Sequence, residues 1–210
     1  MLGTHWDSTW TSCALTPPDA LLARLLAAWR EPQRHYHTLQ HLEECLNLAA
    51  DLRTETCRPP EIELALWFHD AVYDVHAHDN EARSAAWAVQ ALAAAGLDAS
   101  ACRRIHDLIL ATRHGAAPAT DDATMDTALL MDIDLAILGA PAPRFAEYER
   151  QIRAEYAWVT PDVFATRRRA ILQGFLDRPA IYATPALHTR LEAAARSNLE
   201  RAISGEADPV

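Results

Sequence analysis

The sequence has few of the residues that would support a sheet, a disulfide framework or a membrane span. It contains only 6 glycines and few β-branched residues, whereas alanine and leucine are abundant, and this composition favours helices. The 4 cysteines form no Cys-x-x-Cys pair, so neither a zinc–thiolate site nor a disulfide framework is indicated. No apolar run reaches the roughly 18 residues that a membrane-spanning helix requires.

Positive charge is also scarce. The chain has 19 basic and 29 acidic residues and a formal charge of −10, which repels nucleic-acid backbones and anionic membranes. The short basic run Arg167-Arg168-Arg169 fits a solvated helix face. We therefore expect no nucleic-acid partner and no membrane partner. The first residues lack the charged and apolar regions of a signal peptide, which predicts a cytoplasmic protein.

Helical periodicity runs through most of the chain. A length of 210 residues suits a single domain. Thr160-Pro161 and Thr184-Pro185 resemble a capping threonine followed by proline at the first helical position. The sequence predicts a compact all-α fold over residues 1–210, with C-terminal helices in 143–205 packed on the rest. The expected helices cover about 19–29, 36–49, 61–70, 80–95, 99–112, 124–138 and 143–158, and two more begin near 161 and 185.

One apolar stretch holds a histidine and an aspartate side by side. Residues 65–73 read ALWFHDAVY, which places His69 and Asp70 among tryptophan, phenylalanine and aliphatic residues. Burying an uncompensated charge costs several kcal/mol or forces the group to become neutral. A bound metal ion would explain both residues, provided that the rest of the chain supplies further ligands.

Other ligand-type residues lie in similar apolar surroundings. His37 and His41 are four residues apart, so on a helix they would share one face. Asp132 and Asp134 lie in LLMDIDLAILG, and His114 stands at the end of IHDLILATRH, just after the expected helix 99–112. Imidazole and carboxylate ligands from different helices of a bundle can build a metal site. Depending on geometry, they suit Mn, Mg, Fe, Co, Ni or Zn.

Each of these residues also has a purely structural interpretation. His37 can decorate an exposed helix start, and His41 can be a hydrogen-bonded core histidine. His69 can end a helix beside Asp70, where the helix dipole favours an imidazolium. Two residues that are two positions apart, as in Asp132-Ile133-Asp134, lie about 200° apart around a helix. Only one of the two aspartates can therefore face inward, and the periodicity does not decide which.

Three motifs, taken in order, carry a family resemblance. Tyr-His-Thr-Leu-Gln-His at 36–41, Trp-Phe-His-Asp at 67–70 and Asp-Ile-Asp-Leu at 132–135 together resemble the HD superfamily of metal-dependent phosphohydrolases, particularly a group of small predicted bacterial members. The resemblance covers about residues 34 to 138. It implies an HD-domain helical bundle whose metal-site core lies in that range. The motif Asp-Asn-Glu-x-x-Ser-Ala at 79–85 is part of the same likeness.

The resemblance also implies roles for individual residues. His41, His69, Asp70 and Asp134 would bind the metal, and Asp70 would bridge two ions in a dinuclear site. His37 would donate a proton to the leaving group. The resemblance further offers a set of accessory residues: His114, Asp132, Asp79 and Glu81 near the metal, and Arg153 or Arg168 for phosphate. Asp79 and Glu81 can equally be ordinary residues of a helix start.

The expected function is metal-dependent hydrolysis of a small phosphoester or nucleotide by a metal-activated water. One or two divalent ions would be the cofactor, and a small phosphorylated molecule the partner. Two alternatives stay open: a di-iron oxygenase on the same fold, and a metal- or nucleotide-binding module without catalysis. The sequence indicates neither the substrate nor the oligomeric state.

Overall fold

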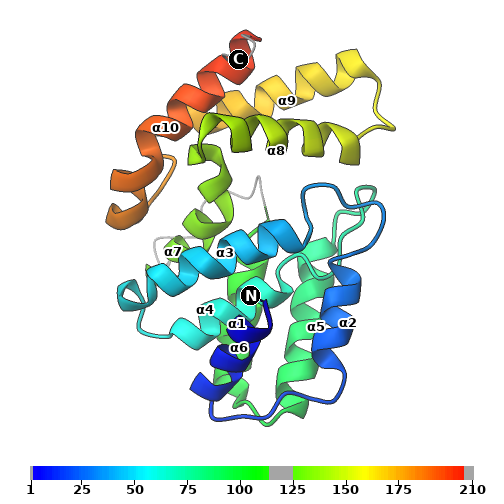
Figure 1. The fold of residues 1–210 in the computed structure, drawn as a ribbon, viewed down its shortest axis with the longest axis vertical. Helices are drawn as coiled ribbons and strands as arrows, with labels where there is room; N and C mark the ends of the chain where they lie inside the picture. Colours follow the sequence, from blue (N-terminus) through cyan, green and yellow to red (C-terminus); the bar gives the residue numbers. More distant parts are fainter. Residues whose placement is uncertain (1, 114–124, 206–210) are drawn as a thin grey trace. The chain divides into compact units, whose positions relative to one another are not determined.

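The computed structural model describes residues 2–113 and 125–205 (Figure 1). These residues form ten α-helices and no strand, which confirms the predicted all-α class. None of the helices in this part of the chain is long and apolar enough to cross a membrane. The chain divides into two compact units, Met1–Met131 and Asp132–Val210, and the boundary lies inside α7 (Met125–Asp134).

The first unit is built around α4 (Pro59–Phe68). Proline at the first helical position fits the fixed φ of a helix start. Every residue from Ile62 to Phe68 is buried, which is typical of a helix that is surrounded by protein. The helices in contact with it are α1 (Leu2–Ser12), α3 (Leu39–Asp51), α5 (Asn80–Ala94) and α6 (Ala99–Ala111) (Figure 1). The His-Asp pair therefore follows the most buried helix of this unit.

Helix α1 was not expected from the sequence. It packs aromatic rings rather than aliphatic side chains on α4, and the ring centroids of Trp6 and Trp67 lie 5.0 Å apart. The buried carboxylate of Glu63 accepts a hydrogen bond from Thr9 Oγ1 at 2.6 Å and another from Arg53 at 2.7 Å. Polar side chains thus help to hold α1 on α4, and the periodicity of apolar residues does not register them.

The second unit contains a 3₁₀ turn (Leu135–Gly139), α8 (Ala142–Glu155), α9 (Pro161–Leu176) and α10 (Pro185–Ser204). Helix α10 contacts both α9 and the 3₁₀ turn. Gly139 permits this contact, because a Cβ atom there would lie only 2.7 Å from the Cβ atom of Leu191. Asn198 Nδ2 donates to the carbonyl oxygens of Leu138 and Ala140 at 2.8 and 2.9 Å, which holds the turn on α10.

Two details of the expected helix starts are wrong. Thr160 and Thr184 do precede α9 and α10, but neither side chain caps its helix. The Thr184 hydroxyl instead donates to Asp132 at 2.6 Å. The helix expected from about residue 36 begins at Leu39, because Thr38 is its N-cap and its side chain accepts the Gln40 N–H.

Candidate metal centre

The start of α3 separates the two histidines of the first motif. His41 lies in the first turn of α3 and is buried, whereas His37 precedes the N-cap and is half-buried. The prediction that both lie on one face of a single helix is therefore wrong. Their rings are nevertheless close, with centroids 6.0 Å apart. The turn before the helix, rather than helical periodicity, brings them together.

The end of α4 fixes the orientation of His69. This residue is the C-cap of α4, and its Nδ1 atom lies 2.9 Å from the carbonyl oxygen of Leu66. A carbonyl oxygen only accepts hydrogen bonds, so Nδ1 carries the proton and donates. In the neutral ring, Nε2 then bears the free electron pair that a metal ion requires.

Ligand-type atoms converge around that nitrogen. His69 Nε2 lies 3.2 Å from His41 Nε2 and 3.2 Å from Asp70 Oδ2. Two atoms bound to one ion at about 2.0–2.1 Å, with an angle of roughly 90–110°, lie about 2.9–3.4 Å apart. The observed separations fall in this range. His41 and His69 are both buried, and each offers a ring nitrogen that could bind a metal ion.

The two imidazoles have a largely apolar surrounding. The Trp29 ring lies 5.4 Å from the His69 ring and 6.3 Å from the His41 ring, between centroids. The Tyr36 ring lies 4.8 Å from the His41 ring. Cys45 Sγ is 3.7 Å from His41 Nδ1 and 3.8 Å from Nε2. Such a setting strengthens electrostatic interactions with an ion, because little water screens them.

His37 reaches the edge of this group. Its Nε2 atom lies 4.0 Å from Asp70 Oδ2, and 17% of its side chain is exposed. The ring stacks on Tyr73, with centroids 4.1 Å apart and planes 28° apart. His37 is thus the imidazole of the group that both meets solvent and faces the carboxylate. That position suits a group that exchanges protons.

Arg34 is a residue that the sequence analysis missed. Its side chain is fully buried, and it donates to the carbonyl oxygens of His37, Asp70 and Ala71 at 3.2, 2.7 and 3.2 Å. Its Nε atom donates to Glu31 at 3.1 Å. A single guanidinium therefore joins the segment before α3 to the turn after α4. No spacing or composition signal marks this arginine in the sequence.

The motif at 79–85 holds the chain that follows Asp70. Ser84 Oγ accepts the Val72 N–H at 3.0 Å, and Asn80 exchanges hydrogen bonds with the backbone of Asp74 at 3.1 and 2.9 Å. Asp79 is exposed and lies 3.9 Å from Arg83, while Glu81 lies 3.7 Å from Arg113. Each of these carboxylates thus faces an arginine, and the predicted place of both near a metal stays a prediction.

Both aspartates of α7 are buried, and the start of α10 holds the carboxylate of Asp132. Asp132 is buried and accepts hydrogen bonds from the N–H groups of Ala183 and Thr184 and from the Thr184 hydroxyl. Burial raises the pKa of its carboxyl, although these hydrogen bonds act to lower it. Asp134, at the end of α7, is also buried. The carboxylate oxygens of Asp132 thus accept hydrogen bonds from the residues that begin α10.

Both predicted phosphate-binding arginines have partners inside the second unit. Arg153 donates to the carbonyl oxygens of Tyr156 and Val159 at 2.7 and 2.9 Å, where α8 ends. Arg168 pairs with Glu149 and lies over the Tyr148 ring, 5.0 Å from its centroid. These contacts stabilise the unit, and phosphate binding stays a prediction. His114 lies outside the described residues.

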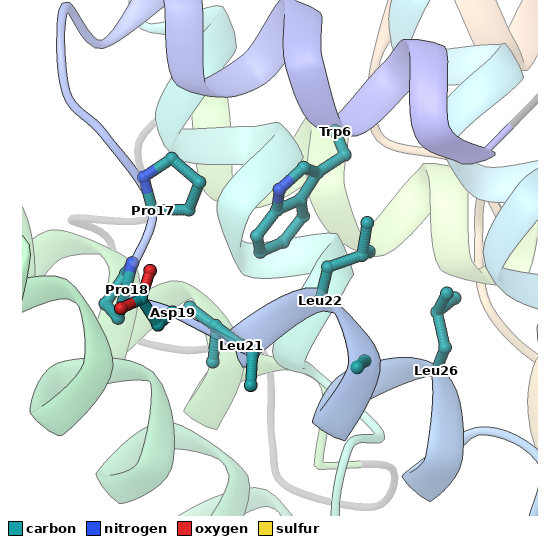
Figure 2. A pocket seen from close by; sticks show the side chains of 9 residues that line it. Trp6, Pro17, Pro18, Asp19, Leu21, Leu22 and Leu26 are labelled. Atoms are coloured by element: carbon teal, nitrogen blue, oxygen red, sulfur yellow. The ribbon is translucent and has the colours of Figure 1, made fainter.

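A separate hollow lies between α1 and the start of α2 (Leu21–Ala28). Figure 2 shows the Trp6 indole facing Pro17, Leu21 and Leu22 across it. Its volume is about 460 Å³, and its lining contains neither imidazole nor thiol. The lining therefore differs in its chemistry from the histidine group.

Comparison of the chain with models of protein families, with curated proteins and with solved structures gave no match. The resemblance to the HD superfamily therefore rests on the sequence motifs alone. What the structure adds is the convergence of the first two motifs within one unit.

Proposed function

We propose that the protein is a metal-dependent hydrolase of small phosphoesters or nucleotides. The observation that carries the proposal is the convergence of His41 Nε2 and Asp70 Oδ2 on His69 Nε2, each at 3.2 Å. These ligand types fit a divalent ion: two neutral nitrogens and a carboxylate oxygen suit Zn, Mn, Fe, Co or Ni. The motif resemblance adds Asp134 as a further ligand.

The chain's own residues supply orientation and proton transfer. The Leu66 carbonyl holds His69 in the tautomer that presents Nε2. A divalent ion, when bound, would polarise a phosphate oxygen and lower the pKa of a coordinated water. His37, whose side chain is 17% exposed beside Asp70, donates its proton to the departing oxygen as the phosphorus–oxygen bond breaks. Imidazole suits this role, because its ordinary pKa lies near neutrality.

The test combines metal analysis with a substrate panel. The purified protein is analysed for bound metal and is assayed with generic phosphoesters and nucleotides in the presence of Mn, Mg, Co or Ni. We expect metal-dependent release of phosphate or of the leaving alcohol. In Asp70→Asn the activity should fall by at least about 10³-fold, because an interaction at the reacting centre is lost. His106→Gln is the matched control, since His106 is half-exposed and pairs with its neighbour Asp107.

The outcomes separate the remaining alternatives. Bound iron together with oxygen consumption, without phosphate release, would favour an oxygenase. Bound metal or nucleotide without turnover would favour a binding module. A protein that folds and takes up no metal under any of these conditions would leave the His41–His69 contact as a structural N–H···N hydrogen bond, and the proposal would be withdrawn.

A further inference from the structure

Arg34 connects two chain segments that carry the proposed chemistry. The side chain is fully buried, and its Nη1 atom donates to the carbonyl oxygens of both His37 and Asp70. Buried arginines are rare unless they are paired, and here one carboxylate and three carbonyl oxygens satisfy the guanidinium. One rigid fork therefore sets the distance between the backbone at His37 and the backbone at Asp70.

A stack of rings transmits the same constraint to the side chain of His37. The guanidinium of Arg34 lies 5.3 Å from the centroid of the Tyr73 ring. Tyr73 also stacks on the His37 ring, with the ring centroids 4.1 Å apart. The Trp29 ring, which also packs on His69, lies 5.5 Å from the guanidinium. Arg34 thus contacts the backbone of His37 and also the ring against which its imidazole rests.

We infer that Arg34 is a positioning residue, which holds the imidazole of His37 at a fixed distance from the Asp70 carboxylate. This inference rests on the proposed function, because it assigns Arg34 a part in delivering the His37 proton. The side chain donates to backbone oxygens and is fully buried, so it acts through His37 and Asp70 rather than on a substrate. A misplaced proton donor slows the reactions whose leaving group needs protonation and spares the others.

The test compares two esters that share the transferred phosphoryl group and differ in the leaving group. A 4-nitrophenyl ester leaves as a stable anion, whereas an alkyl ester needs a proton. In Arg34→Lys we expect kcat on the alkyl ester to fall by about 10²-fold, with a loss below about threefold on the nitrophenyl ester. KM and bound metal should stay unchanged for both esters.

A second readout does not depend on activity. Hydrogen exchange of the metal-free protein should quicken in Arg34→Lys at residues 35–40 and 69–74, because the clamp between them is lost. Arg196→Lys is the matched control. Arg196 also binds one carboxylate and three carbonyl oxygens, those of Glu192, Leu176, Arg178 and Pro179. This control should quicken exchange near 176–181 and show no preference between the two leaving groups.

Equal losses on both esters, or unchanged exchange at 35–40 and 69–74, would overturn the inference. If Arg34→Lys does not fold, Glu31→Ala replaces it, because it removes the carboxylate that pairs with Nε and Nη2 of Arg34 and leaves the three carbonyl oxygens in place. In Glu31→Ala we expect the same selective loss of kcat on the alkyl ester, but a smaller one. If the parent protein hydrolyses neither ester, the proposed function is contradicted. The hydrogen-exchange experiment would still decide whether Arg34 fixes the distance between His37 and Asp70.

Discussion

The carboxylate of Asp132 accepts both the backbone N–H and the hydroxyl of Thr184, at 2.7 and 2.6 Å. It also accepts the N–H of Ala183 at 3.0 Å. We expect Asp132→Asn to lower the free energy of unfolding by about 1–3 kcal/mol, because an amide NH₂ would face an N–H donor and leave it unsatisfied. Urea unfolding monitored by circular dichroism measures this. Bound metal should not change.

For Asp134→Asn we expect the opposite result, a loss of metal binding with little loss of stability. The motif resemblance would make Asp134 a metal ligand, so this variant should lose metal affinity by at least about tenfold and keep most of its stability in the metal-free state. Metal titration of both variants under identical conditions compares them directly. If Asp132→Asn loses the metal and Asp134→Asn retains it, the assignment of the two aspartates is reversed.

Metal binding should stabilise the fold through His69. A ligand that binds only the folded state adds about 2.7 kcal/mol when it is present at 100 times its Kd, so the thermal midpoint of the parent should rise as metal is added. In His69→Gln this rise should disappear. Differential scanning calorimetry with and without a chelator measures the effect. An equal rise in parent and variant would mean that the ion binds elsewhere.

Glu192 should make the second unit sensitive to acid. Burial acts to raise the pKa of its carboxyl, but hydrogen bonds from the N–H groups of Ile181 and Tyr182, together with Arg196, lower it below the ordinary value. A carboxylate with a lowered pKa in the folded state contributes stability above its unfolded pKa and loses it as pH falls through the folded value. Glu192→Gln should therefore lower Tm by about 2–4 °C at pH 7.

The pH profile of that variant provides its check. The difference in Tm between parent and Glu192→Gln should be constant above about pH 5 and should shrink as the carboxyl becomes protonated below about pH 4.5. If the difference in Tm does not vary with pH, the charge on Glu192 contributes nothing to the stability of the fold.

Two glycines of the second unit should respond in opposite directions to alanine. Gly139→Ala would place a Cβ atom 2.7 Å from Leu191 Cβ and 2.9 Å from its carbonyl oxygen, and overpacking of this kind costs about 1–3 kcal/mol. Gly174 lies within α9, where a Cβ atom would meet nothing within 4 Å. Gly174→Ala should therefore stabilise the protein, by up to about 1 kcal/mol. Chemical denaturation of the pair tests both expectations.

The sequence was informative where burial and periodicity agree. The run that ends in His69-Asp70 begins with proline and is wholly apolar from Leu64 to Phe68, so α4 and its terminal polar pair could be predicted to within two residues. The end of α5 and the start of α6 could be predicted because Gly96, at φ +90°, stops the first helix and Asp98 caps the second. Local residues of known conformational preference decide these features.

The features that could not be predicted depend on distant partners. Arg34 reads as an ordinary charged residue, and its burial is possible only because carbonyl groups at His37, Asp70 and Ala71 meet it. The place of His37 was mispredicted because helical spacing was extended across Thr38, whose side chain starts the helix instead. Helix α1 was not predicted, because its buried face combines Trp6 and Trp10 with the polar residue Thr9 and so lacks a regular apolar pattern.

Trp29 gives the candidate metal centre an optical reporter. Its indole N–H donates to the Trp67 carbonyl oxygen at 3.1 Å, and its ring lies 5.4 Å from the His69 ring. Fluorescence of an indole so placed is quenched by a paramagnetic ion at the neighbouring imidazole and spared by a diamagnetic one. The occupancy of the centre, and the electronic character of the ion in it, can therefore be followed in the unlabelled protein, with Trp29→Phe as the blank.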